Sequence, residues 1–355
     1  MVIRVHFPLS EGKKPQLGLA AALHVGGFTD ASVEVGPEYS KLDRLNEEAP
    51  NAFEVVDLDQ ADVVVYPYCA EPVPAVDAVA EAARMRNIGC VFFSWGDADK
   101  PVKVPYGTVY RHSLFADRRL DCERAMACEV SDPRMEIGLP IWPREKRPTP
   151  RVGFCGAVSN PLMRTVYRMM RRQRKAEGLA MRARALRALK RTKGLETNFI
   201  SRQSYWAGSR GRFHRNVDGE FRPRAAFWNN VLNSDYTLCM RGAGNFSYRF
   251  YEVLAAGRIP LLLDTRCVLP FDDEIEWRQH CVWVEEDQHE SAGEILKEFH
   301  SGVSPDQFRT LQMANRRLWE TKLSPLGFLK RALAKEVSRT ARAPGWNGEF
   351  GSAVV

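Results

Sequence analysis

RGAGNFSYRFYEVLAAGRIPLLLDTRCVLPFDDEIEW, residues 241–277, places a polar glycine loop, a short helix and a hydrophobic strand directly one after another. Helical signals begin at Ser247, a typical N-cap residue, and continue with one apolar face through residues 248–256. Gly257 stands where a helix C-terminal glycine belongs, and residues 259–263 read as a buried strand with Pro260 near its start. The stretch therefore predicts part of an α/β sheet in which a loop leads straight into a helix.

The loop and the start of this helix carry groups that favour an anionic ligand. Gly242 and Gly244 allow backbone amides to approach a ligand closely, and a helix N-terminus offers free N–H groups and positive potential. Arg241 and Arg249 would add charge-assisted hydrogen bonds to a diphosphate. Glu252, on the same helical face as Arg249, can accept hydrogen bonds from ribose hydroxyls. Glycine turns and Arg–Glu pairs are also common as plain architecture, but here three polar residues converge on one helix end.

The same residues resemble the donor-site signature of the exostosin-like glycosyltransferases, which combines an Arg-Gly loop, Ser-x-Arg-Phe, a Glu and Ile-Pro. The matching positions are Arg241, Gly242, Ser247, Arg249, Phe250, Glu252 and Pro260. Downstream, Leu-Pro-Phe at 269–271 and Ile-x-Trp at 275–277 also match. The resemblance covers residues 225–286, with weaker likeness at 61–68 and 152–156. The predicted donor-binding residues are Arg241, Gly242, Gly244, Ser247, Arg249 and Glu252.

This resemblance implies an α/β fold of the GT-B type, in which two Rossmann-like doubly wound domains face a central cleft. It implies inverting transfer of a sugar from a nucleoside-diphosphate sugar, most simply UDP-linked, to a glycan or lipid-linked glycan acceptor. A GDP-sugar enzyme of the fucosyltransferase-like kind is the alternative within this class. Because protein groups neutralise the diphosphate in such enzymes, we expect no cofactor and no metal. The absence of a second catalytic domain after Trp277 and of an anchor at the start favours single-sugar transfer over polymerisation.

Alternating strand and helix signals extend over the rest of the chain and support a doubly wound sheet. Strands are expected at residues 2–7, at the end of 54–66 and at 90–94, with an amphipathic helix at 73–86. The proline-rich segment 140–150 predicts a linker, after which the pattern restarts at Val152. We predict an acceptor-side domain at 1–147, a donor-binding domain at 148–325, and a C-terminal helix and tail at 326–355. Residues 305–342 read as helical, interrupted at Pro325.

An inverting transfer also needs a base that removes the proton of the acceptor hydroxyl. Asp97 is the first choice, because it follows the predicted strand 90–94 and the carboxyl ends of parallel strands open onto the ligand site. Together with Asp99 it forms an Asp-x-Asp pair, which we interpret as loop acids and not as a metal site. His6, His112 and Glu71 are alternatives.

Charge is concentrated in residues 164–193, which carry twelve Lys and Arg and a single acid, Glu177, in a chain of net charge +7. A basic helix of this kind could contact anionic lipid headgroups, at about 1 kcal/mol per basic residue. A solvated helix face with its apolar stripe in the core is an equally good interpretation. Nucleic-acid binding is disfavoured, because no nucleic-acid motif accompanies the charge. The loop 201–224 could be a mobile lid or a plain surface loop.

Composition fits a two-domain enzyme of 355 residues. No signal peptide or transmembrane stretch is recognisable, so a cytoplasmic protein is expected, with peripheral membrane contact possible through residues 164–193. The eight cysteines form no Cys-x-x-Cys pair and suggest neither zinc nor disulfides. Two other classes stay open: a nucleotide-sugar binder without a base, and a basic nucleic-acid-binding protein whose affinity would fall steeply with salt.

Overall fold

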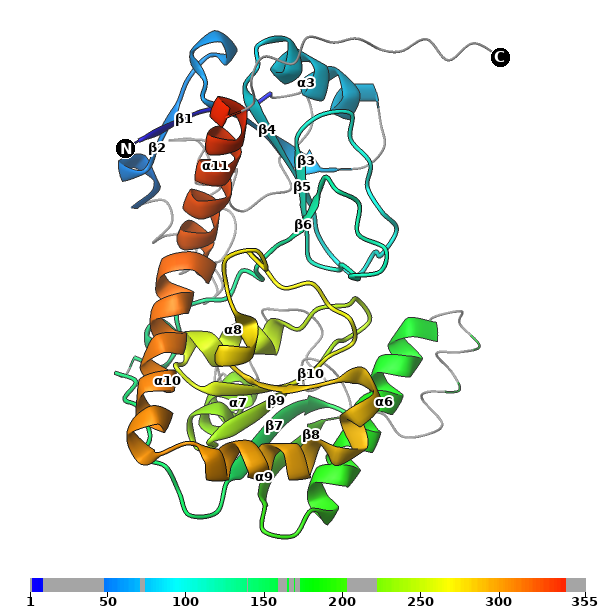
Figure 1. Cartoon of the computed structure of the whole chain (residues 1–355), viewed down its shortest axis with the longest axis vertical. Coiled ribbons are helices and arrows are strands. Elements are labelled where there is room, and N and C mark those ends of the chain that lie inside the picture. The colour runs from blue at the N-terminus through cyan, green and yellow to red at the C-terminus, as the bar shows by residue number, and fades with distance from the viewer. Residues whose placement is uncertain are drawn as a thin grey trace.

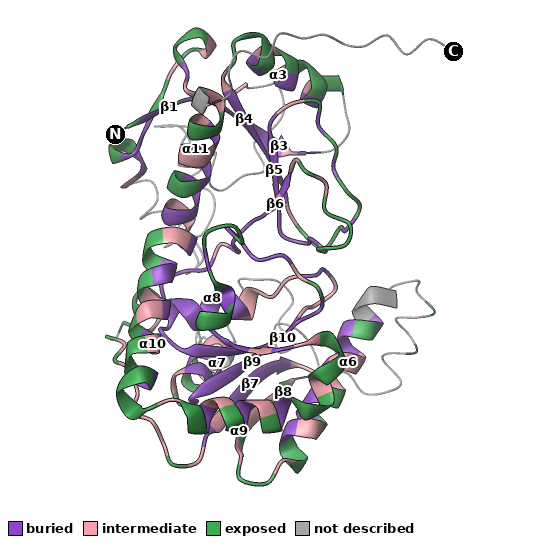
Figure 2. Cartoon of the chain, in the orientation of Figure 1, coloured by how far each residue is buried: buried purple, intermediate pink, exposed green. Residues whose placement is uncertain are grey.

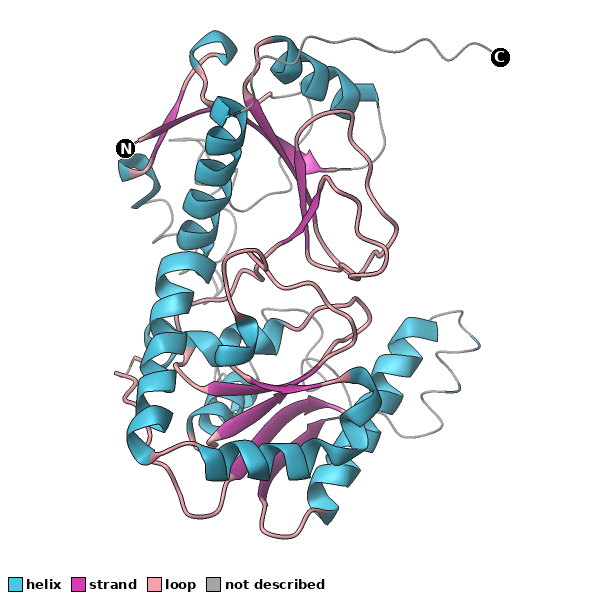
Figure 3. Ribbon diagram, in the orientation of Figure 1, coloured by secondary structure: helices cyan, strands magenta, loops and turns pink. Residues whose placement is uncertain are grey.

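The computed structural model of the chain contains two parallel β-sheets, each covered by helices (Figures 1 and 3). It describes residues 2–8, 48–70, 74–138, 140–158, 165, 169, 173–202 and 222–342. The first sheet has the strand order β2-β1-β3-β4-β5-β6 and the second the order β11-β10-β9-β7-β8. The predicted α/β fold with two parallel sheets covered by helices is confirmed.

The first sheet is built from β1 (Ile3–His6), β2 (Phe53–Val55), β3 (Val63–Cys69), β4 (Gly89–Ser94), β5 (Thr108–Arg111) and β6 (Glu123–Ala125). Its connections include the 3₁₀ turns η1 (Ala49–Asn51) and η2 (Leu58–Gln60) and the helix α3 (Pro74–Met85). The segment 54–66, expected to end in one strand, contains two. The polar turn at 57–62 separates them, because its side chains cannot be buried in the sheet.

The second sheet comprises β7 (Arg151–Ala157), β8 (Glu196–Arg202), β9 (Tyr236–Cys239), β10 (Ile259–Leu263) and β11 (Val282–Val284). Its helices are α6 (Gln173–Arg191), α7 (Arg222–Leu232), α8 (Tyr248–Ala255), α9 (Ala292–Gly302) and α10 (Pro305–Leu318), with the 3₁₀ turns η3 (Trp277–Gln279) and η4 (Glu286–Ser291). Chain order reverses between neighbours β7 and β9, since β8 lies outside β7. In doubly wound sheets, ligands bind at the carboxyl ends of the strands beside such a reversal.

Strand alternation divides the second sheet into two apolar faces. One face carries Phe154 and Leu261 and packs against Leu186 and Leu189 of α6 and Leu296 of α9. The opposite face belongs to a larger core that also includes α7, α8 and residues of the first sheet. The inner strands β3, β4, β9 and β10 are buried along almost their whole length, whereas the edge strands β2 and β8 are partly exposed (Figure 2).

The stretch around α8 folds as its sequence predicts. The backbone N–H of Gly257 donates to Leu254 (2.9 Å) and that of Arg258 donates to Val253 (2.9 Å), the bond pattern of a Schellman motif. Gly257 has φ of +57°, a conformation that only glycine adopts without strain. The buried strand β10 follows directly. Ser247 occupies the N-cap position with extended backbone, but its side chain makes no capping hydrogen bond.

The linker predicted at 140–150 has no regular secondary structure and lies against the second domain, where Arg144 Nε reaches Asp235 (3.3 Å). It is preceded by the short helix α4 (Pro133–Ile137). After α10, a π-helical turn at Trp319–Leu323, labelled η5, marks the predicted interruption, and α11 (Pro325–Arg342) follows.

Helix α11 returns to the first domain (Figure 1). Glu336 accepts a hydrogen bond from Thr108 Oγ1 of β5 (2.8 Å), and the ring of Phe328 packs edge-on against Tyr110 (5.4 Å between centroids). The C-terminal helix therefore covers one face of the first sheet and links the two lobes.

The described part of the basic segment 164–193 is largely α6. Ala185, Leu186 and Leu189 are buried in the second domain, while Arg184 and Arg187 are exposed. This is the solvated helix with its apolar stripe in the core. No helix among the described residues is long and apolar enough to cross a membrane. Residues 203–221, the body of the predicted lid or surface loop, lie outside the described residues.

Candidate active site

Arg249 lies in the first turn of α8, beside the carboxyl end of β7. Its guanidinium carbon is 4.5 Å from the centre of the Phe154 ring, and Nη2 donates to the backbone oxygen of Cys155 (2.6 Å). Its buried Nε donor has no acceptor among the described residues. A Cβ added at Gly156 would stand 2.5 Å from Arg249 Nη2, so this glycine makes room for the guanidinium. Arg249 thus lies at the chain reversal where a ligand is expected.

A second arginine, Arg182 of α6, lies beside the same aromatic ring. Its guanidinium carbon is 5.7 Å from the centre of Phe154, and it donates to the backbone oxygens of Ala157 (2.8 Å) and Arg241 (3.4 Å). It therefore ties the end of β7 to the glycine loop. This role was not predicted, because Arg182 looks like one more basic residue of 164–193. A signal was present: Arg182 falls on the apolar stripe, three residues before Ala185.

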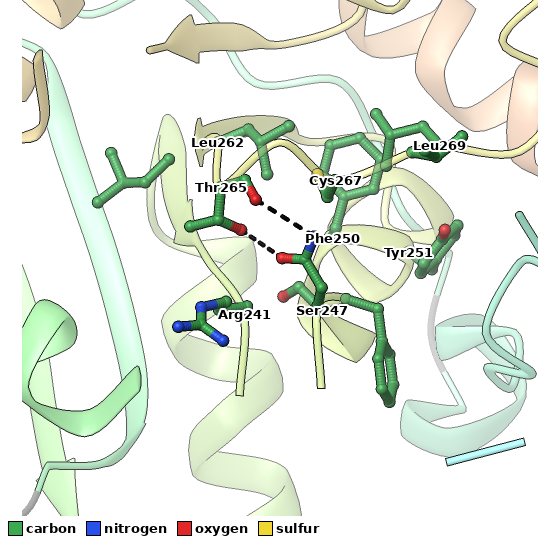
Figure 4. Close-up of a pocket in the computed structure, with 12 residues that line it drawn as sticks. Arg241, Ser247, Phe250, Tyr251, Leu262, Thr265, Cys267 and Leu269 are labelled. Atoms are coloured by element: carbon green, nitrogen blue, oxygen red, sulfur yellow. Dashed lines mark hydrogen bonds between the residues drawn. The ribbon is translucent and has the colours of Figure 1, made fainter. Parts of the chain in front are cut away.

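Arg241 begins the glycine loop directly after β9. Its side chain is 10% exposed and contacts Glu177 weakly (3.5 Å), while its buried Nε has no acceptor among the described residues. Together with Ser247 it lines a pocket that has room for little more than one water molecule. In Figure 4, Arg241 and Thr265 lie at one side of this pocket and Tyr251 at the other. A nucleotide would not fit inside it.

The two glycines of the loop have different surroundings. Nothing lies within 4 Å of a Cβ added at Gly242, so this position is open to a ligand. A Cβ at Gly244 would lie 2.8 Å from Cα of Asp97 and 2.6 Å from the ring of Phe246. Gly244 therefore permits the first domain to approach the loop closely. This role of the glycine was not predicted.

Asp97 follows β4 and contacts the glycine loop from the first domain. Its Oδ1 accepts a hydrogen bond from the backbone N–H of Gly244 (2.9 Å), and the residue is otherwise exposed. The next residue of the loop, Asn245, is buried and is held from the same side by Ser113 Oγ (3.0 Å) and by the backbone oxygen of Leu114 (3.1 Å). The structure thus brings the predicted base and the predicted donor loop together at the junction of the two domains.

The other candidates for the acid or base are less suitable than Asp97. Some lie away from this junction, and others lie at it but are buried. Asp99 is buried and lies 3.5 Å from Arg118. His6, at the end of β1, bonds the backbone oxygen of Val56 through Nδ1 (3.1 Å). Glu71 lies outside the described residues. Within the described ranges no three His, Cys, Asp or Glu side chains are grouped to hold a metal ion.

His112 is the fourth candidate and is packed between the domains. Its ring stacks on Phe246 of the glycine loop (5.1 Å between centroids) and meets Tyr248 edge-on (6.0 Å). Burial lowers its pKa to about 4, against a smaller opposing effect of a hydrogen bond to the backbone of Ala127. Its buried Nε2 has no partner among the described residues. A neutral, enclosed imidazole of this kind supports the packing of the loop and is poorly placed to receive an acceptor's proton.

The depressed pKa of His112 makes stability dependent on pH. The unfolded state takes up a proton near pH 6.5, whereas the folded state resists it until about pH 4, so stability falls as the pH drops through this window. The contribution amounts to about 3 kcal/mol when the pH reaches 4. We expect the free energy of unfolding, measured by urea titration, to fall less steeply between pH 6.5 and pH 4 in His112→Phe than in the wild type. Equal slopes for the two proteins would contradict this assignment.

Glu252, the predicted ribose ligand, lies one turn further along α8 and is 9% exposed. Its Oε1 accepts a hydrogen bond from Arg224 Nη1 of α7. The same guanidinium makes two bonds to Glu136 of α4, through Nε (2.7 Å) and Nη2 (2.9 Å). Arg224 and Glu136 were not predicted, because contacts between segments 88 residues apart leave no local pattern.

Comparison with known proteins identifies one family model. The Exostosin GT47 domain matches residues 157–299, which include β9, α8 and β10. Exostosin-1 of Drosophila melanogaster is 34% identical over 90 residues, which cover 25% of this chain and 11% of that protein. The Exostosin-1 homolog of Caenorhabditis elegans is 33% identical over 66 residues, 19% of this chain and 17% of that protein. The chain thus spans under a fifth of the length of either relative. A glycosyltransferase of Rickettsia africae aligns with TM-score 0.39 and 11% identity, covering 97% of this chain and 100% of that one.

Proposed function

Since the chain carries an exostosin-like glycosyltransferase domain, we propose that it transfers a sugar from a UDP-sugar to a hydroxyl group of a glycan or lipid-linked glycan, with inversion at the anomeric carbon. The observation that carries the proposal is the meeting of Asp97, from the first domain, with the glycine loop of the second. A transferase needs a base and a diphosphate site at one place, and this contact supplies a candidate for each.

The donor side of the proposal rests on positive charge at the chain reversal. Arg249 and Arg182 lie beside one ring at the end of β7, and Arg241 follows β9. Buried Nε donors of Arg241 and Arg249 have no acceptor among the described residues, and Gly242 is open to a ligand. Guanidinium groups bind diphosphate oxygens in pairs and stabilise the negative charge of a leaving diphosphate.

The reaction is a single displacement. Asp97 takes the proton of the acceptor hydroxyl, whose oxygen attacks the anomeric carbon while the bond from this carbon to the diphosphate oxygen breaks. UDP leaves with the electron pair of the broken bond, and its charge is met by Arg241 and Arg249. One carboxylate oxygen of Asp97 is held by Gly244, which leaves the exposed remainder of the carboxylate for the acceptor.

The acceptor and its location are proposals of the same kind. The exposed basic residues of α6, which include Arg184, Arg187 and Lys190, could attract an anionic membrane that carries a lipid-linked acceptor. Because the apolar stripe of α6 is buried, this attraction would be electrostatic only, and salt would weaken it. We propose on this ground that the enzyme works at the cytoplasmic face of a membrane.

A panel of nucleoside diphosphates tests the donor class. We expect UDP to raise the melting temperature saturably, whereas GDP, dTDP and CDP have smaller effects at equal concentration, because only the matching base completes the site. Differential scanning fluorimetry without added metal is sufficient for the measurement. A larger shift with GDP would move the assignment to a GDP-sugar transferase, and no shift with any of the four would contradict the donor site.

A further inference from the structure

Arg224 is a half-buried link between two carboxylates that the sequence keeps far apart. Its Nη1 donates to Oε1 of Glu252, and its Nε and Nη2 donate to the two oxygens of Glu136 at 2.7 and 2.9 Å. The Glu252 and Glu136 side chains are 12% and 7% exposed. All three guanidinium nitrogens are thus engaged, in a planar arrangement that a lysine ammonium cannot reproduce.

Two aromatic rings pack against the guanidinium of Arg224. Its carbon lies 4.7 Å from the ring centre of Trp228 and 4.9 Å from that of Phe227. Trp228 also donates its indole N–H to Glu136 (2.6 Å). Glu136 belongs to α4, in the segment that leads into the linker, so the network joins that segment to α7 and α8. The position of Arg224 is therefore fixed by several independent contacts, as expected for a side chain that orients another side chain.

The position of Glu252 depends on this arrangement. The hydrogen bond from Arg224 to Oε1 restricts the orientation of the carboxylate, and among the described residues no hydrogen bond to its Oε2 is found. A fixed carboxylate with one oxygen available suits the hydroxyl groups of a ribose. Two carboxylates share one guanidinium, so the cluster keeps an excess of one negative charge. It is therefore suited to accept hydrogen bonds and unsuited to bind phosphate directly.

We propose that Arg224 is a positioning residue for donor binding: it orients Glu252 toward the ribose and does not itself touch the nucleotide. The proposal rests on the proposed function, because it takes Glu252 as the ribose ligand. Glu136 and the rings of Trp228 and Phe227 hold Arg224 in turn.

A double-mutant cycle on UDP binding tests this role. We expect Glu252→Gln to weaken UDP binding in isothermal titration by roughly tenfold to a hundredfold, and Arg224→Met to weaken it by about tenfold. If Arg224 acts only through Glu252, the double variant binds UDP no more weakly than Glu252→Gln alone. In kinetics, Arg224→Met should raise KM for the UDP-sugar with a smaller effect on kcat, and Arg224→Lys should restore part of the affinity.

Arg309→Met is the matched control. Arg309, in α10, likewise bonds a carboxylate of another segment, Glu145 of the linker (2.7 Å), but this pair is on the exposed surface. Its loss should therefore leave UDP binding unchanged. Additive losses in the cycle, or unchanged UDP binding by a folded Arg224→Met, would overturn the positioning role while leaving the proposed function intact. Undiminished UDP binding by Glu252→Gln, or no UDP binding by the wild type, would instead overturn the proposed function and this inference with it.

Discussion

Asp97→Asn is expected to lower kcat by about 10²- to 10⁴-fold while UDP binding remains within a factor of about two, because the change removes a general base and little else. An asparagine Oδ1 can still accept the hydrogen bond from the N–H of Gly244, so the contact between Asp97 and the glycine loop survives. Initial rates with a UDP-sugar and titration with UDP would measure the two quantities on the same preparation.

A control separates loss of the base from loss of a contact between the domains. Asp272 of the second domain bonds Arg119 of the first (2.7 Å), without a contact to the glycine loop in this ion pair. Asp272→Asn weakens one such contact and should keep kcat within a factor of about two, since exposed ion pairs contribute little. If Asp97→Asn turned over as fast as the wild type, another group would be the base. The protein would be a nucleotide-sugar binder if no turnover were found in the wild type.

Arg249→Met is expected to lower kcat/KM by about 10²- to 10³-fold, because a guanidinium that meets the charge of the departing diphosphate is removed. The fold should survive, since a methionine can fill the space beside Phe154 without leaving a buried charge. The comparison of kcat/KM with the melting temperature checks both statements.

Gly156→Ala offers a second version of the same experiment. The added Cβ would stand 2.5 Å from Arg249 Nη2, so the guanidinium must move although its charge is kept. We expect an intermediate loss of kcat/KM, because the geometry is wrong and the charge is still present. Wild-type turnover in a folded Arg249→Met protein would show that Arg249 is not part of the site.

Local patterns were sufficient for the fold around the glycine loop. The helix at 248–256, its glycine end and the strand at 259–263 follow from the sequence because caps and periodicity act over a few residues. The short strands β5 and β6 and the edge strand β11 were not predicted. Each spans three or four residues and is stabilised by its neighbours in the sheet, which a local pattern does not reveal.

The candidate site was predicted in part, from residues that lie close together in the chain and from one residue that follows a predicted strand. Arg241 and Arg249 were found from spacing, and Asp97 from the rule that ligands lie at the carboxyl ends of strands. Arg224 and Arg182 were missed because their partners come from distant segments. Gly244 had been interpreted as a contact for a ligand, and the structure adds that it makes room for Asp97.

The crystal structure of the protein with UDP tests the central claim most directly. We predict that the diphosphate lies against the outer side of the glycine loop, within hydrogen-bond distance of Arg241 and Arg249, and that the ribose hydroxyls contact Glu252. A nucleotide bound elsewhere, or one bound there while both guanidiniums and the Glu252 carboxylate make no contact with it, would contradict the account.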